Sequence, residues 1–321
     1  MQNVDPRSHS RLIEAALESG AAARSAVAAS WSRSARMHGL DPAQRARPQR
    51  MTGTELRRAV ERMEPLVRAA GPSLDRLFQA VGGVGCCVLL ADREGVPLDR
   101  RGAPADDTAF EDWGLWPGVR WSEADQGTNG IGTALVEGRA VTIHGEDHFL
   151  SENTALTCIS TPLYDHDGQL CGVLDVSSGR ADLTAGFQRL IAHAVAEAAQ
   201  RIEVEALRLA FPRARIVLPP GADGAGGGAQ PAAALAVDGD DLVVGATRAA
   251  RALLRLPPDL GATPVPTADL FGQGDETLAE AEAAVLRRAL ARAGGNVSAA
   301  ARQLGISRAT LYRKIAAPRR G

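Results

Sequence analysis

The residues best suited to chemistry lie near the carboxyl end of the chain, where basic side chains gather. Residues 296–321 contain six basic residues and no acidic one. Arg308, Ala309 and Thr310 begin a predicted helix, where an arginine suits the O6 and N7 acceptors of guanine. Neighbouring polar and basic residues are expected to contact phosphates. The predicted DNA-binding residues are Asn296, Ser298, Ser307, Arg308, Ala309, Thr310, Tyr312, Arg313 and Lys314.

A second group of candidates surrounds a glycine-rich segment, residues 127–134 (GTNGIGTA). Its glycines resemble a phosphate loop, but no lysine and no strand–GxGxxG–helix context accompany them. A structural interpretation is favoured, in which Thr and Asn cap a short helix over residues 131–137 that covers a pocket. Aromatic residues cluster nearby, and either core packing or pocket lining would use them. The predicted effector-binding residues are Trp116, Trp121, Thr128, Asn129, Phe149 and Cys158.

Two other kinds of chemistry are not supported by the sequence. Lys314 is the only lysine and does not follow a glycine-rich loop, which excludes a P-loop ATPase. His144 and His148 lie four residues apart in a predicted loop, so we expect no metal site there. We also expect no cofactor and no catalytic residue.

The four cysteines lack CxxC spacing, and Cys158 and Cys171 are expected to be small core residues. Cys86 and Cys87 are adjacent in a predicted strand, so one should point inward and the other outward. The chain has no apolar run long enough to span a membrane, and residues 1–20 lack the apolar region of a signal peptide. We therefore expect reduced thiols in a soluble, cytoplasmic protein.

Charge is distributed unevenly along the 321 residues, a length typical of two or three domains. Residues 1–80 hold 13 arginines and 8 acidic residues, residues 81–274 hold 14 basic and 26 acidic residues, and residues 275–321 hold 9 and 4. An acidic middle with a basic end indicates that the end contacts a polyanion.

The elements that must position these residues follow an α+β pattern. Residues 1–80 form a predicted helical region, with helices over 11–19, 21–38 and 54–70 and an interruption at Gly71-Pro72. Residues 81–210 form a sensor-sized α+β domain, with strands over 84–91, 96–98, 140–143, 156–163 and 169–176 and a helix over 187–209. Residues 211–274 are a linker with a hairpin fragment over 233–256.

Residues 275–321 have the spacing of a helix-turn-helix. Predicted helices cover 275–293, 297–304 and 308–316, and Gly305 supplies the turn. Ile306, Leu311 and Ile315 are expected to close a small core beneath the helices.

Residues 296–315 (NVSAAARQLGISRATLYRKI) resemble the Fis-type helix-turn-helix that ends many bacterial enhancer-binding regulators. The resemblance implies a dimer formed through the preceding helix, and binding to inverted repeats of double-stranded DNA.

Residues 121–177 resemble the GAF domain of acetoin- and glycerol-metabolism activators of the AcoR type, through WSEADQGTNGIGTAL, EGRAVTIHGEDHFL and LTCISTPLYDHDGQLCGVLDVSS. Such sensors bind a small effector between sheet and helices. The hairpin fragment weakly resembles the start of a PAS-like insert. Since that family usually carries an ATPase module before the DNA-binding domain, its absence predicts that activation of sigma-54 polymerase by ATP hydrolysis does not operate.

The sequence therefore predicts a ligand-responsive, sequence-specific DNA-binding transcriptional regulator, with RNA polymerase as a further partner. Two alternatives stay open. One is a regulatory partner that heterodimerises with an ATPase-bearing sigma-54 activator. The other is a GAF-fold thiol reductase that uses Cys86, Cys87 or Cys158.

Overall fold

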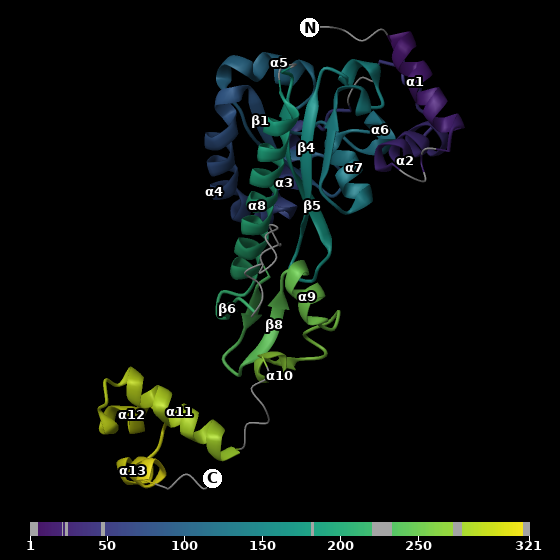
Figure 1. The fold of residues 1–321 in the computed structure, drawn as a ribbon. Helices are drawn as coiled ribbons and strands as arrows, with labels where there is room; N and C mark the ends of the chain where they lie inside the picture. The colour runs from purple at the N-terminus through teal and green to yellow at the C-terminus, as the bar shows by residue number, and fades with distance from the viewer. Residues whose placement is uncertain are drawn as a thin grey trace. The chain divides into compact units, whose positions relative to one another are not determined.

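The structure is a computed structural model that describes residues 6–20, 22, 25–45, 49–180, 183–219, 233–271 and 278–316. The chain divides into two compact units, Met1–Val265 and Pro266–Gly321, drawn in Figure 1. Helices and antiparallel sheets alternate in the first unit, and the second is helical at its end, which confirms the α+β fold class.

The N-terminal helices pack on the loop before the fourth strand. Helix α1 is Pro6–Glu18, and α2 (Ala26–Ser32) continues into a π-helical turn, Arg33–Met37. Ser25 caps α2 by accepting a hydrogen bond from the backbone of Ala28. A small apolar cluster holds these helices in place and consists of Ile13, Trp31, Phe149 and Leu150.

Helices α3 (Gly53–Arg62) and α4 (Glu64–Val81) are separated at Met63, not at Gly71-Pro72 as the sequence predicted. Thr52 and Glu55 form a capping box that starts α3. Pro72 lies inside α4, although an interior proline costs about 3 kcal/mol. The buried face of α4 offsets this cost, because Ala70, Leu74, Leu77 and Val81 all pack into the main core.

The sensor sheet has five antiparallel strands in the order β2-β1-β5-β4-β3. Each strand falls close to its predicted position. The strands are β1 Cys86–Asp92, β2 Pro97–Arg101, β3 Val141–His144, β4 Thr157–Tyr164 and β5 Leu170–Ser178.

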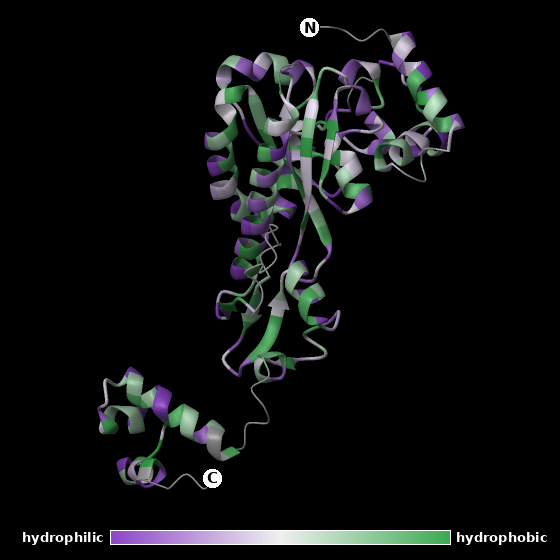
Figure 2. Ribbon diagram, in the orientation of Figure 1, coloured by the Kyte–Doolittle hydropathy of each residue, from purple (hydrophilic) through white to green (hydrophobic). Residues whose placement is uncertain are grey.

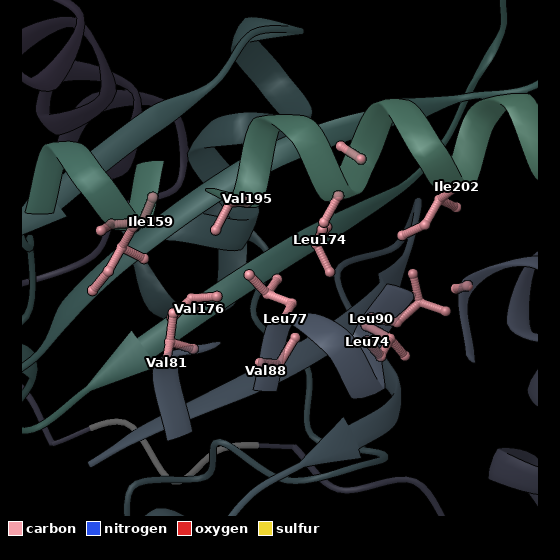
Figure 3. Close-up of a cluster of buried hydrophobic side chains, with 14 of the residues drawn as sticks. Leu74, Leu77, Val81, Val88, Leu90, Ile159, Leu174, Val176, Val195 and Ile202 are labelled. Atoms are coloured by element: carbon pink, nitrogen blue, oxygen red, sulfur yellow. The ribbon is translucent and has the colours of Figure 1, made fainter. Parts of the chain in front are cut away.

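Helices cover both faces of this sheet. On one face α4 and the long α8 (Ala185–Ala210) lie side by side (Figure 1). Their apolar residues interlock with those of β1, β4 and β5, as Figure 3 shows for Leu77, Val88, Leu174 and Val195. The opposite face carries the short helices α5 (Asp107–Asp112), α6 (Glu123–Gln126) and α7 (Gly130–Glu137).

The prediction that one of Cys86 and Cys87 points outward is wrong, because helices cover both faces of the sheet. Cys86 and Cys87 do point to opposite sides of β1, but both side chains are buried. Cys86 packs under α4 and α8, and Cys87 packs on the face of α7. Neither faces solvent, because this sheet has no open side at β1.

The hairpin fragment is folded into a second, smaller sheet. It has the strand order β6-β7-β8-β9, formed by Arg215–Val217, Leu235–Val237, Leu242–Ala246 and Val265–Pro266. In Figure 2 the strand β8 is coloured as hydrophobic over most of its length. Helix α9 (Arg248–Leu254) follows β8 and is capped by Thr247.

The second unit begins with α10 (Thr267–Phe271) and ends in three helices, α11 Leu278–Arg292, α12 Val297–Gln303 and α13 Arg308–Ala316. Gly305, with φ of 65°, makes the turn between α12 and α13. The core under these helices contains Leu286, Ala289, Ala300, Ala301 and Leu311. Ile306 packs against it as predicted, whereas Ile315 is 45% exposed because it lies near the end of α13, beyond that core.

Candidate nucleic-acid interface and effector site

Helix α13 presents a basic face to solvent on a fixed support. Leu311 is fully buried in the core of the second unit, which sets the rotation of the helix about its axis. Arg308, Ala309 and Arg313 are consequently exposed, and the Arg308 guanidinium lies over the ring of Tyr312, 5.5 Å from its centroid. The predicted base-reading residues therefore share one accessible helix with Arg313, one of the predicted phosphate-binding residues.

Four of the predicted DNA-binding residues, Lys314 among them, already make side-chain hydrogen bonds within the protein. Asn296 accepts from the backbone of Ala299 and caps α12, and Ser307 accepts from the backbone of Thr310, 3.0 Å away, and caps α13. The hydroxyl groups of Ser307 and Thr310 are also bonded to each other, and Ser298 is half-buried. These caps fix the starts of the two helices that a duplex would meet.

Lys314 has an acidic partner in this structure. Its ammonium group forms an ion pair with Glu282 on α11, and both side chains are partly exposed. An exposed ion pair of this kind contributes about 0–1 kcal/mol, so a DNA phosphate would compete with Glu282 for Lys314.

The glycine-rich segment of the sensor folds as a capped helix start. Asn129 caps α7, since its Oδ1 accepts from the Gly132 amide at 2.8 Å and its Nδ2 donates to the Gly127 carbonyl at 2.8 Å. Gly130 is required by close packing, because a Cβ there would lie 2.4 Å from the Ser160 hydroxyl. Thr128 and Asn129 are both fully buried.

A buried ionic network, which sequence reasoning missed, ties the N-terminal helices to this segment. Glu123 on α6 is 2% exposed and accepts from Arg33 Nε at 2.8 Å and from the Ser30 hydroxyl at 2.6 Å. Arg33 also pairs with Glu137 at the end of α7, at 2.9 Å. The hydrogen bonds that Arg33 donates to Glu123 raise the pKa of Arg33. The signal in the sequence is Ser30-x-x-Arg33, polar residues one helical turn apart.

A second missed feature is a row of buried polar side chains on β4 and β5, facing α7. Asp175 is fully buried and accepts from the hydroxyls of Ser160 and Ser177. Ser177 also contacts Cys158, whose sulfur lies 3.5 Å from His148 Nε2. Polar residues at alternate positions of a strand are the signal that could have found this row.

Burial dominates the protonation of this polar row. It raises the pKa of Asp175 to about 6, against the two serine hydroxyls that favour the carboxylate. Burial likewise lowers the pKa of His148 to about 4, so its imidazole is neutral at physiological pH. At physiological pH the polar row therefore contains a neutral His148 and an Asp175 that is still mostly ionised.

The predicted aromatic residues are split between two clusters. Trp121 and Cys158 are buried in the cluster beneath α7, and Trp116 packs at its edge. Phe149 instead belongs to the cluster with Trp31 that supports the N-terminal helices. Trp121 donates to the carbonyl of Gly114 at 2.8 Å. An effector role for these residues, and for Thr128 and Asn129, stays a prediction.

A groove of about 650 Å³ lies elsewhere, between α4 and α8, and is lined by charged residues including Arg76, Arg201 and Glu205. None of the predicted effector-binding residues lines it. Within the described residues, no group of histidine, cysteine or acidic side chains has the arrangement of a metal site. Nor does any described helix have the length and apolar character needed to cross a bilayer.

Comparison with known proteins places two domains on the chain. Residues 5–200 match the model of the MimR N-terminal domain, and residues 277–317 match that of the Fis family of bacterial regulatory proteins. Both matches confirm the resemblance inferred from the sequence. Residues 201–276 separate them and contain no P-loop.

Curated relatives include regulators of catabolic operons. The acetoin catabolism regulatory protein of Cupriavidus necator is 35% identical over 256 residues, which cover 78% of this chain and 37% of that protein. The propane 2-monooxygenase operon transcriptional activator MimR of Mycolicibacterium smegmatis is 33% identical over 181 residues, covering 54% and 29%. The chain thus spans about a third of the length of these relatives.

Among solved structures, the crystal structure of the E. coli DhaR(N)–DhaL complex has a similar fold. The TM-score is 0.52 at 18% identity, and the match covers 73% of this chain and 78% of that one. The likeness supports the arrangement of the sensor part of the chain.

Proposed function

Since the chain belongs to the family that carries the MimR N-terminal domain, we propose that it is a one-component transcriptional regulator that binds DNA and responds to a small effector. The Fis-family match and the transcriptional activators among its relatives support this assignment. The observation that carries it is the exposed basic face of α13 on a packed three-helix support.

The DNA-binding step uses α13 in the major groove. Arg308, Ala309 and Thr310 at its start contact base edges, and Arg313 and Lys314 contact phosphates together with residues at the start of α12. Two copies of the chain bind an inverted repeat as a homodimer. Exposed apolar residues on α11, Leu278 and Val285, support pairing through this helix.

The effector step uses the sheet face covered by α7. The carbonyl of Gly138, at the end of this helix, accepts two hydrogen bonds. One comes from the Tyr164 hydroxyl on β4 at 2.8 Å, and the other comes from Arg248 on α9 at 3.3 Å. An effector that moves α7 therefore also changes the contacts of α9. The effector shifts the population between two arrangements of the dimer and so changes DNA binding or the contact with RNA polymerase.

The two alternative functions, a GAF-fold thiol reductase and a partner of an ATPase-bearing activator, receive unequal support. Burial raises the pKa of all four thiols, that of Cys171 to about 12, which disfavours the thiolate that a reductase needs. The exposed residues of α11 support pairing with an ATPase-bearing relative as much as pairing with a second copy. Co-purification with such a relative, without DNA binding by the chain alone, would favour that alternative.

A salt series tests the proposal. We propose a cytoplasmic location for the chain. The affinity of the purified chain for labelled duplex DNA should fall steeply as the salt concentration rises, because phosphate contacts release counterions. The double variant Arg308→Ala/Arg313→Ala should lower the affinity and flatten the slope, whereas Arg58→Ala, which replaces an exposed arginine on α3, serves as a control. Absence of duplex binding at low salt would contradict the proposed function.

A further inference from the structure

The edge strand of the sensor sheet contains a buried arginine whose donors are incompletely used. The side chain of Arg100 on β2 is 9% exposed, and its Nη1 donates to Asp107 at 2.7 Å. Among the described residues, neither its Nε nor its Nη2 has a hydrogen-bond partner, although both atoms are buried. Unsatisfied donors on a buried cation are costly, so this position favours an acceptor.

The two unused donors lie on one edge of the guanidinium. Nε–H and the adjacent Nη2–H point in the same direction, and their spacing matches the two oxygens of a carboxylate. Asp107 occupies the other side through Nη1, so it leaves this edge free. A planar, two-oxygen acceptor therefore fits the free edge better than a single-point acceptor does.

Aromatic rings lie against the guanidinium of Arg100. The guanidinium carbon lies 4.4 Å from the ring centroid of Trp116 and 5.4 Å from that of Phe110. Phe110 in turn makes an edge contact with Trp113, at 6.0 Å between centroids. Aromatic walls exclude water and accommodate an apolar group attached to the carboxylate.

Gly102 leaves room for the guanidinium of Arg100 to lie against the backbone. A Cβ at this position would lie 2.2 Å from Nη2 and 2.6 Å from the central carbon of the guanidinium of Arg100. Any other residue would displace the guanidinium from the aromatic walls. Glycine at position 102 therefore suits the observed position of the Arg100 guanidinium.

The register of the sheet places Arg100 in line with the buried polar row. Arg100 pairs with Leu89, Leu89 with Asp175, and Asp175 with Ser160. Directly paired residues point to the same face, and two strand spacings amount to roughly 10 Å. An anionic group is attracted to Arg100 and repelled by Asp175, which fixes the direction in which a ligand would lie.

We propose that Arg100 anchors the carboxylate of a small effector whose apolar part packs on Trp116 and Phe110. This inference rests on the proposed function and names the chemical class of its effector. The half-exposed Asp107 and the half-buried Trp113 and Trp116 give access from the side of α5. The aromatic edge beside Trp116 was expected as ligand-binding, whereas Arg100 was not.

Benzoate, with benzamide as its uncharged analogue, tests the proposal on the full chain. Saturable binding is followed by tryptophan fluorescence and by the midpoint of thermal unfolding. Benzoate should bind and benzamide should not. Arg100→Gln should weaken benzoate binding about 10- to 100-fold, as expected for lost hydrogen bonds to a charged group.

Matched variants separate the anchor from general effects of charge and folding. Arg100→Lys keeps the charge but loses the paired donors, and it should also weaken binding about tenfold. Arg101→Gln removes the neighbouring arginine, which pairs with Asp75 and Asp99, and should bind benzoate as the wild type does.

Three outcomes overturn the proposal: no benzoate binding, equal binding by benzamide or inorganic phosphate, or unchanged binding in both Arg100 variants. Duplex DNA binding by the same samples without benzoate reports on the proposed function separately. Loss of DNA binding with intact benzoate binding would contradict the regulator and leave the carboxylate anchor standing.

Discussion

The DNA-binding unit and the sensor domain use polar residues in opposite ways. On α13 the basic side chains face solvent, and the few internal contacts are helix caps and one exposed ion pair. Beneath α7 the polar side chains are buried and bonded to one another. The comparison teaches that DNA binding through α13 would require no more than release of the exposed Lys314–Glu282 pair, whereas an effector beneath α7 would have to displace buried contacts.

The largest effect on stability is expected for the buried ionic network of Arg33, Glu123 and Glu137. Glu123→Ala would leave Arg33 without its main partner in a largely buried position, and should lower the free energy of unfolding by about 3–5 kcal/mol. Urea denaturation measures this loss. Glu111→Ala breaks the exposed pair with Arg50 and should cost about 0–1 kcal/mol. Equal losses in the two variants would remove the contrast between buried and exposed polar groups.

The protonation of His148 sharpens the same contrast. Because its folded pKa is about 4 against 6.5 for an ordinary histidine, the unfolded chain binds more protons between these values and stability is lost as pH falls through them. The free energy of unfolding of the wild type relative to His148→Gln should therefore fall by up to about 3 kcal/mol across this window. Asp175 titrates in the same range with the opposite sign, but it is present in both proteins.

In the DNA-binding unit, Arg308→Ala should weaken operator binding by about 1–3 kcal/mol and relax the base preference at one position of the operator. Arg313→Ala should weaken binding to all sequences alike and reduce the salt slope by about one. Fluorescence anisotropy over a set of duplexes separates the two effects. If both variants behaved identically, the division into base and phosphate contacts would be wrong.

The smallest effect is expected at Lys314. Glu282→Gln releases this lysine from its ion pair and should raise DNA affinity by less than about 1 kcal/mol, with little change in stability. A decrease in affinity would show that Glu282 positions Lys314 instead of competing for it.

Local patterns in the sequence predicted much of the fold. The helix-turn-helix, the strands of the sensor sheet and the start of α7 follow from glycine positions, caps and apolar periodicity, which act over a few residues. The break at Met63 and the continuity of α4 through Pro72 were missed, because tertiary burial outweighed the local cost of a proline.

The parts of the candidate site that were missed depend on long-range pairing. Glu123 meets Arg33, and Arg100 lines up with Asp175, only through the packing of α2 and the register of three strands. Trp116 and Phe149 are both aromatic and flank the glycine-rich segment in the sequence, yet they belong to different clusters. Residue type identified candidates, but topology decides which of them meet.

The most direct test of the account is capture of genomic DNA fragments by the purified chain at physiological salt, beside the Arg308→Ala/Arg313→Ala variant. The account predicts a shared inverted repeat among the captured fragments and its loss in the variant. Salt-labile capture without a common motif, or the same motif in the variant, would contradict sequence-specific binding through α13.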